Sequence, residues 1–301
     1  MSWTQSRGSF NRIGGVTRRA FGPAAVQFRR GALQMKMARG LLVVCILLLP
    51  LHEARAWGRA AHRIVSAVAE KRLTPAARAG VRDLLEPDET LAQASLWADD
   101  HRQDLRANAA WHYVNVPITE PHYDSRFCSS AGCVVSKVGE LRIVLGNAAL
   151  SRSERQLALR LLVHFVEDLH QPVHVGDRGD RGGNDLQVRF FGSGTNLHRL
   201  WDEGILLRQN SDESAWIAQI DALATSEQSR QWTQCDVATW ADESLEAARQ
   251  AYSIPGSGLA LEPGSKLGQE YFEFALPIVR RRLAQAAARL ATTLNQLFAT
   301  K

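Results

Sequence analysis

Histidine and aspartate residues recur at helical spacing in the middle of the chain. The spacing His-x-x-x-Asp occurs twice, once at His164 and Asp168 and again at His198 and Asp202. Residues four apart on a helix lie one turn apart on the same face, so each imidazole and carboxylate form a ready bidentate metal site. With His174 between the two pairs, the pattern indicates bound metal, and nitrogen and oxygen ligands suit Zn²⁺.

An N-terminal leader precedes these residues. Residues 35–39 form a short basic stretch, residues 41–51 form an almost unbroken apolar run, and Ala54-Arg55-Ala56 has the small-x-small pattern of a cleavage site. This order is typical of a secretory signal peptide, and the apolar run is short for a membrane span; an uncleaved anchor is the alternative. We therefore expect residues 1–56 to be an extension plus a cleaved signal peptide. The mature chain, residues 57–301, would be secreted or periplasmic, without stable membrane association.

Cleavage before Trp57 would expose an α-amine beside a further candidate ligand. A free α-amine has a pKa of about 7.7–8.0, so losing its proton to bind a metal near neutral pH costs little. The carbonyl of Trp57 could complete a five-membered chelate, and His62 lies on the first expected helix within reach of this terminus. His62 alone would more often be a surface residue, and only the wider pattern favours a ligand.

The charge of the chain is unevenly distributed. Its 36 Lys and Arg residues outnumber 31 Asp and Glu residues, and a pI near 9.3 suggests a partner such as nucleic acid or a membrane surface. Residues 1–56, however, hold nine of the basic residues and one of the acidic residues. The expected mature chain is therefore slightly acidic, which argues against a wholly basic nucleic-acid-binding surface.

Helical periodicity dominates the rest of the chain, so we expect an all-α protein, a single mostly helical domain with a small β-hairpin. The expected helices cover residues 60–71, 74–85, 90–105, 136–150, 153–169, 197–208, 213–225, 232–252 and 267–299. Ser153 and Glu154 would cap the helix that carries His164, and Pro172 follows its end. Residues 186–191 alternate like a strand that turns at residues 192–194, and residues 111–117 are expected to be extended.

Cysteine usage is consistent with export, which permits disulfides. Cys128 and Cys133 lie five residues apart in a Ser-Ser-Ala-Gly loop and could close a small ring. Cys235 would then be left without a partner as a free thiol, or it would be an alternative partner in the disulfide. No cysteine spacing matches a zinc finger, so His, Asp and Glu would hold any metal.

The order of the motifs resembles that of a known enzyme family. The shared residues are Trp57-Gly58, His62, Trp97-Ala98-Asp99, Trp111-His112-Tyr113-Val114-Asn115, the stretch from His164 to His174, Gly182-Gly183-Asn184 and the stretch from Asn196 to Asp202. They look like those of the trinuclear-zinc, single-strand-specific nucleases of the S1/P1 type, which include mung bean nuclease and are distantly related to bacterial zinc phospholipase C. The resemblance continues weakly through residues 240–244.

This resemblance implies three zinc ions and nine ligand residues. The first ion would be held by Asp99, His112, His164 and Asp168. The second would be held by His174, His198 and Asp202. The third would be held by the amine and carbonyl of Trp57, by His62 and by Asp168, which would bridge it to the first.

The resemblance also implies roles for residues that do not bind metal. Arg102 matches an arginine near the phosphate, Tyr113 resembles a base-stacking residue, and Asn184 would contact substrate. Family nucleases often carry Asp at the position of Asn115, where it is thought to orient the attacking water. Asn can accept a hydrogen bond but cannot take a proton, so its presence weakens a general-base assignment there.

The spacing of residues leaves two assignments open, one between two copies of a motif and one for His170. Trp240-Ala241-Asp242 duplicates Trp97-Ala98-Asp99, and spacing alone does not choose between them; the resemblance selects Asp99. His170 lies about 120° from the helix face of His164 and Asp168, which favours a structural hydrogen-bonding role for it.

The expected function is that of a secreted zinc-dependent endonuclease acting as a monomer. It would cleave single-stranded DNA and RNA to 5′-phosphate products and also act as a 3′-nucleotidase. Zinc lowers the pKa of a bound water towards about 7, and a cationic cluster suits a phosphodiester transition state. The alternatives are a phospholipase C-like zinc phosphoesterase and a non-enzymatic secreted zinc-binding protein. Structural zinc sites are usually closed tetrahedra, often with Cys, so the carboxylate-rich pattern favours an enzyme.

Overall fold

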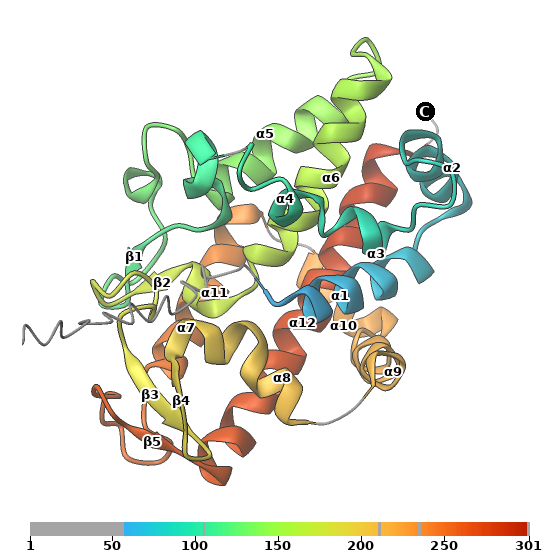
Figure 1. Ribbon diagram of the computed structural model, residues 1–301. Helices are drawn as coiled ribbons and strands as arrows, with labels where there is room; N and C mark the ends of the chain where they lie inside the picture. The colour runs from blue at the N-terminus through green and yellow to red at the C-terminus, as the bar shows by residue number, and fades with distance from the viewer. Residues whose placement is uncertain (1–56, 105, 210–211, 234–235, 300–301) are drawn as a thin grey trace, which may run out of the picture. The chain divides into compact units, whose positions relative to one another are not determined.

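The computed structural model describes residues 57–104, 106–209, 212–233 and 236–299 (Figure 1). The leader and Cys235 lie outside the described residues, so signal cleavage and the pairing of Cys235 stay predictions. Cys128 and Cys133 form a disulfide, as the sequence suggested. Within the described ranges, no helix is both long enough and apolar enough to cross a membrane.

Four helices begin the described chain: α1 (Arg59–Lys71), α2 (Pro75–Leu84), α3 (Leu91–Ala94) and α4 (Trp97–Asp100). The single helix expected over residues 90–105 is therefore wrong. The carbonyl of Ser95 accepts a hydrogen bond from His164 Nδ1 at 2.7 Å instead of continuing the helical ladder. This break separates α4, which carries Asp99, from α3.

The longer of the remaining helices follow the expected order with shifted boundaries, and several short helices lie where none was expected from the sequence. They are η1 (Arg106–His112), η2 (Ser125–Phe127), α5 (Val134–Gly146), α6 (Arg152–Asp168), η3 (Pro172–His174), α7 (Leu197–Arg199), the π-turn η4 (Leu200–Gly204), α8 (Ile205–Arg208), α9 (Glu213–Leu223), α10 (Ser226–Thr233), α11 (Val237–Ala251) and α12 (Gln269–Leu297). The helix expected over residues 232–252 is thus divided between α10 and α11.

Two local expectations are also corrected. The cap of α6 is Ser151 rather than Ser153, because the Ser151 hydroxyl accepts from the N–H of Glu154 and the Glu154 carboxylate accepts from the N–H of Ser151. Residues 111 and 112 end the 3₁₀ helix η1 instead of being extended, and only Val116–Pro117 of that segment forms a strand.

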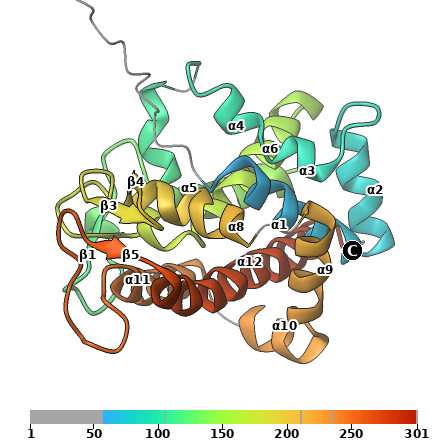
Figure 2. The ribbon, with the colours of Figure 1, turned by 60° about the horizontal axis from the view of Figure 1, so that its bottom comes forward.

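Helix α12 lies at the centre of the helical packing and contacts α1, α6, α8, α9, α10 and α11. Figure 2 shows it running lengthwise, with α9 and α10 near one end and β5 near the other. Residues 283–291 of α12 are all buried and are rich in alanine. Small side chains let several helices approach α12 on different sides, and this places α1 and α6 next to each other.

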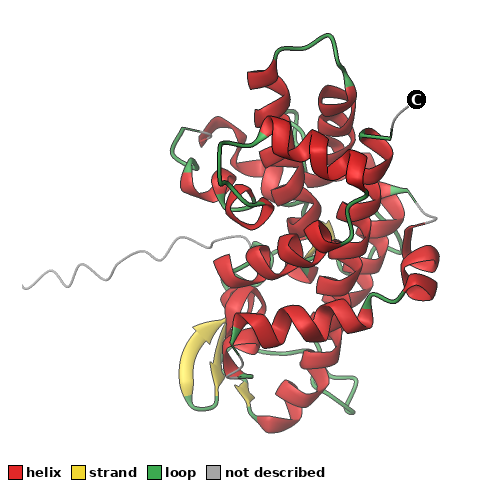
Figure 3. Ribbon diagram, turned by 90° about the vertical axis from the view of Figure 1, so that its right-hand side faces the viewer, coloured by secondary structure: helices red, strands yellow, loops and turns green. Residues whose placement is uncertain are grey.

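The strands are short. Strands β1 (Val116–Pro117) and β2 (Gly176–Asp177) pair in parallel, while β3 (Gln187–Phe190) and β4 (Ser193–Asn196) form an antiparallel hairpin that β5 (Lys266–Leu267) extends. The hairpin turns at residues 191–192, both with positive φ, rather than at residues 192–194. Helices make up most of the described chain in Figure 3, which confirms the mostly helical class with a small β element.

Candidate metal centre

The last turn of α6 carries the central pair of the site. His164 and Asp168 are fully buried, and His164 Nε2 lies 3.1 Å from Asp168 Oδ2. Their i, i+4 spacing brings the two groups together on one face of α6. Because His164 Nδ1 is held by the carbonyl of Ser95, its Nε2 is the nitrogen available to a metal.

Asp99 and His112 approach this pair from two other elements. Asp99 Oδ1 of α4 lies 3.8 Å from His164 Nε2. His112, the last residue of η1, places Nδ1 2.9 Å from Asp168 Oδ2 and 3.1 Å from His164 Nε2. The four residues that the resemblance assigns to one ion therefore meet around His164 Nε2.

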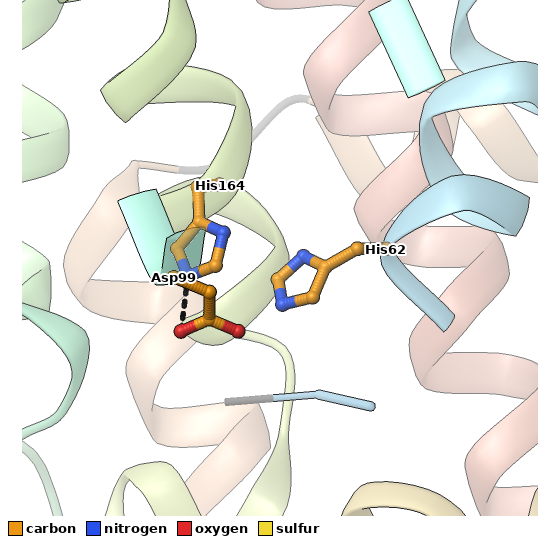
Figure 4. A group of neighbouring side chains, drawn as sticks. All are labelled: His62, Asp99 and His164. Carbon is orange, nitrogen blue, oxygen red and sulfur yellow. Dashed lines mark ion pairs between the residues drawn. The ribbon is translucent and has the colours of Figure 1, made fainter. Parts of the chain in front are cut away.

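His62 reaches the same region from α1. Its Nε2 lies 3.5 Å from Asp168 Oδ1, and its ring stacks on His164 with centroids 4.1 Å apart. Figure 4 shows His62 and His164 converging on Asp99 from different helices. His62, Asp99 and His164 also have ligand atoms within 4.8 Å of one another. His164 can give a metal only its Nε2, because its Nδ1 is bonded to Ser95. A separate ion bound by His62 would therefore need a ligand other than His164, and Asp168 Oδ1 lies 3.5 Å from His62 Nε2.

Trp57 lies two residues before the start of α1 and is fully buried. The N–H of the following residue, Gly58, donates to the carbonyl of Asp202 at 3.0 Å. A Cβ on Gly58 would lie 2.9 Å from the Cβ of Glu203, so glycine permits this close approach. The backbone of Trp57 is thereby held beside Asp202, at the start of the helix that carries His62.

A second group of ligands lies beyond Asp168. His174 of η3 and His198 of α7 present Nε2 to Asp202 at 3.5 and 3.4 Å. Asp202 lies in the π-turn η4, and such turns occur frequently at functional sites. Backbone carbonyls orient both rings, since His174 Nδ1 bonds the carbonyl of His112 and His198 Nδ1 bonds that of Gly182.

Unpartnered buried atoms indicate that these residues fit a cation. Both carboxylate oxygens of Asp99, Oδ1 of Asp168 and Nε2 of His62 are buried without a hydrogen-bond partner within the described residues. Buried polar atoms are normally paired, yet His62 Nε2 lies 3.5 Å from Asp168 Oδ1, and His62 and Asp99 have ligand atoms within 4.8 Å of each other. Imidazole nitrogens and carboxylate oxygens are the ligands that Zn²⁺ accepts in open, catalytic sites.

Burial and neighbouring charges shift the protonation of the site in opposite directions. Burial lowers the pKa of His164, but Asp168 and Asp99 outweigh it and raise that pKa to about 10. Burial opposes ionisation of Asp168, yet His164 and His112 hold its pKa well below the ordinary value. In His62 burial prevails, and its pKa falls well below 6.5. The carboxylate field that stabilises a proton on His164 would equally stabilise a metal cation.

The four predicted residues that do not bind metal occupy more exposed positions. Arg102 lies in the turn three residues after Asp99. Tyr113 and Asn115 are exposed, and they alternate with two buried valines, of which Val114 bonds the carbonyl of His174 in η3 and Val116 pairs with β2. Asn184 donates its side-chain N–H to the carbonyl of Arg181 at 2.8 Å, so in this conformation its amide group is bonded within its own loop.

The structure separates the two Trp-Ala-Asp motifs. Asp242 accepts from the N–H of Tyr123 at 2.6 Å and pairs with His122 at 3.2 Å, away from the histidine groups. Asp99 instead lies among them. His170 is buried, with Nδ1 bonded to a backbone carbonyl and Nε2 to Arg289, which agrees with a structural role.

Two residues of the site were missed by the sequence reasoning. Glu167 is fully buried and bonds both His62 Nδ1 and the hydroxyl of Ser66. Gln171 donates to Asp202 Oδ1 at 2.6 Å. The available signal for Glu167 was an acidic residue within the apolar second half of α6, where an unpaired charge is costly.

The comparisons with known proteins agree with this geometry. Residues 57–299 match the S1/P1 Nuclease family. The chain is 31% identical to Endonuclease 2 of Arabidopsis thaliana, over 86% of this chain and 96% of the relative, and 32% identical to Endonuclease 4 of the same plant, over 86% and 94%. It is 27% identical to Nuclease S1 of Aspergillus oryzae, over 79% of this chain and 91% of the relative. The chain is therefore a phosphodiester hydrolase that belongs to the S1/P1 nuclease family.

Proposed function

We propose that the chain is a secreted zinc-dependent endonuclease that cleaves single-stranded DNA and RNA to 5′-phosphate products and also hydrolyses 3′-nucleotides. The observation that carries this proposal is the convergence of three adjoining His and Asp groups, several of whose buried ligand atoms lack a partner among the described residues. Membership of a nuclease family supplies the reaction class.

The nine ligands would hold three zinc ions. Asp99, His112, His164 and Asp168 would hold one, and His174, His198 and Asp202 a second. His62, Asp168 and the backbone amine and carbonyl of Trp57 would hold the third. This last set requires cleavage between residues 56 and 57, because an amide nitrogen has no lone pair to offer a metal. The proposal therefore includes export, and we expect the mature chain to act as a monomer.

Bound zinc supplies Lewis-acid chemistry, lowering the pKa of water and stabilising negative charge on phosphate. The guanidinium of Arg102 would bind a phosphate oxygen and stabilise the charge that develops during cleavage. The amide of Asn115 would orient the attacking water by a hydrogen bond without taking its proton. We assign the leaving 3′-oxygen to the end of the site formed by His174, His198 and Asp202, so products would carry 5′-phosphates.

Substrate choice would rest on stacking rather than on reading base edges. The exposed ring of Tyr113 follows His112 directly and can accept any base that is not already stacked in a duplex. Asn184 would contribute a polar contact if its amide turned away from Arg181. Because the expected mature chain is slightly acidic, attraction of the phosphate backbone would be confined to the metal centre and Arg102.

The two Trp-Ala-Asp motifs provide a matched test. We would compare Asp99→Asn and Asp242→Asn with the wild-type secreted chain, measuring zinc content and cleavage of single-stranded DNA, RNA, duplex DNA and 3′-AMP. We expect Asp99→Asn to lose at least about 100-fold in kcat/KM and Asp242→Asn to stay within about threefold. Exhaustive chelation should abolish activity, and Zn²⁺ should restore it.

Contrary outcomes are distinct for each part of the proposal. Undiminished cleavage after complete removal of metal would refute zinc dependence. Products with 3′-phosphate ends would refute the assigned direction of cleavage. Release of phosphocholine from phosphatidylcholine without nuclease activity would favour the phospholipase alternative.

A further inference from the structure

Glu167 is a buried acidic residue that is not among the metal ligands proposed above. It lies on α6 directly before Asp168, and its side chain is fully buried. Both carboxylate oxygens face α1: Oε2 bonds His62 Nδ1, and Oε1 accepts from the Ser66 hydroxyl at 2.5 Å. His62 and Ser66 are four residues apart and share one face of α1. Glu167 therefore joins α6 to α1 at the point where each contributes to the metal centre.

The two nitrogens of His62 have contrasting surroundings. Nδ1 is engaged by Glu167, whereas Nε2 is buried with no hydrogen-bond partner among the described residues. Nε2 lies 3.5 Å from Asp168 Oδ1, which also lacks a hydrogen-bond partner there. A neutral imidazole carries one proton, so a carboxylate that accepts it from Nδ1 leaves the Nε2 lone pair directed at Asp168.

We propose that Glu167 is a positioning residue for the metal ion that His62 and Asp168 hold, an inference that rests on the proposed function. The carboxylate fixes the orientation and tautomer of the His62 ring and increases the basicity of Nε2. The hydroxyl of Ser66 in turn holds the carboxylate in the plane that this contact requires. Affinity for this one ion then depends on Glu167, while the ion at His174, His198 and Asp202 does not.

The alternative is that Glu167 only stabilises the packing of α1 against α6. The two roles differ in what they change. A packing role alters the stability of the metal-free protein and leaves metal affinity of the folded chain unchanged. A positioning role weakens one ion selectively, and a side chain that still accepts from His62 Nδ1 restores part of the loss.

The experiment measures zinc bound per chain across a series of zinc-buffered solutions, together with thermal unfolding of the metal-free proteins. The variants are Glu167→Ala, Glu167→Gln and Ser66→Ala. Glu154→Gln is the control, because Glu154 lies at the exposed start of the same helix, away from the metal centre. Zinc content is read without reference to catalysis.

We expect Glu167→Ala to bind one of its zinc ions about 10–100-fold more weakly and to keep the others at wild-type affinity. Glu167→Gln should weaken binding of the same zinc ion by less than Glu167→Ala does, about threefold. Its amide oxygen can still accept from His62 Nδ1 while its N–H donates to Ser66. Ser66→Ala should show a smaller loss for the same ion, and Glu154→Gln none. If Glu167→Ala does not fold, the Gln and Ser66 variants decide the question.

Unchanged zinc affinity in Glu167→Gln and Ser66→Ala, with or without a shift in thermal unfolding, overturns the positioning role. An equal loss for every ion overturns it too, because that indicates a general disturbance of the fold. If the wild-type chain itself binds no zinc, the proposed function fails, and this inference fails with it. The wild-type measurement therefore separates the two failures.

Discussion

Replacement of Glu243 by Gln tests how the helical core supports the end of α6. The Glu243 carboxylate of α11 lies between two arginines of α12, with Oε2 2.8 Å from Arg282 Nη1 and 2.7 Å from Arg289 Nη1, and Oε1 2.8 Å from Arg289 Nη2. Arg282 also donates to the Ser244 hydroxyl, which donates to the carbonyl of Leu169. This network therefore reaches the residue directly after Asp168.

The expected loss of stability follows from burial of the two cations. Arg282 is 3% exposed and Arg289 is fully buried, whereas the Glu243 side chain retains 31% exposure. Removing one partner of a buried ion pair costs about 3–5 kcal/mol, and the partial exposure of Glu243 favours about 3 kcal/mol. This is a large part of the roughly 5–15 kcal/mol that holds a typical fold together. For a chain of this size it corresponds to a decrease in Tm of about 6–12 °C.

The assay is urea unfolding of the zinc-loaded protein at pH 7.5, followed by tryptophan fluorescence. Glu246→Gln is the matched control: Glu246 lies on the same helix and pairs with Arg249, but its side chain is 59% exposed. Exposed pairs contribute little, so this control should stay within about 0.5 kcal/mol of wild type. If Glu243→Gln loses no more stability than Glu246→Gln, the reasoning from burial is refuted.

The same pair of proteins gives a pH dependence with a defined sign. Burial raises the pKa of Glu243, but Arg289 and Arg282 outweigh it and hold that pKa below its ordinary value of 4.5. A depressed carboxyl pKa contributes stability that is present above the unfolded-state pKa and is lost as pH falls through the folded-state pKa. The stability gap between wild type and Glu243→Gln should stay constant from pH 8 to about 5.5 and narrow below about 4.5. A gap that widens with acid would contradict this sign.

Three further variants test separate parts of the structure. Gly182→Ala should lower the free energy of unfolding by about 2–4 kcal/mol, because Gly182 has a φ of +62° and an added Cβ would lie 2.3 Å from a backbone oxygen. It should also lower zinc content, because the Gly182 carbonyl orients His198. Unchanged thermal unfolding and zinc content would argue against this reasoning. Asn115→Asp should raise kcat on single-stranded DNA about tenfold or more and add an acid limb to its pH profile, whereas an unchanged profile would remove residue 115 from the water-orienting role. Joint replacement of Cys128 and Cys133 by Ser should cost about 2 kcal/mol in unfolding experiments without changing zinc content, and a loss of zinc would show that the ring supports the metal centre.

Local patterns predicted much of the fold because most helices bury one apolar face. The limits of α1 and α2 lie within a residue or two of those expected, and the hairpin and the Cys128–Cys133 disulfide are present. The expected helix over residues 90–105 failed because a distant side chain, His164, takes the carbonyl of Ser95. No local pattern contains that competition, since the two residues are 69 positions apart.

The sequence by itself paired His164 with Asp168 as candidate ligands, because a helix places residues four apart on one face whatever surrounds them. It also placed them in the order that resembles a nuclease family. Spacing alone did not choose between the two Trp-Ala-Asp motifs, and the resemblance selected Asp99 without a physical reason. Tertiary structure supplies that reason, since α4 places Asp99 beside His164 while Asp242 bonds Tyr123. It also revealed Glu167, whose meaning depends on α1 lying against α6. Helical spacing acts over one turn, whereas a multi-metal centre is assembled by packing between elements distant in the chain.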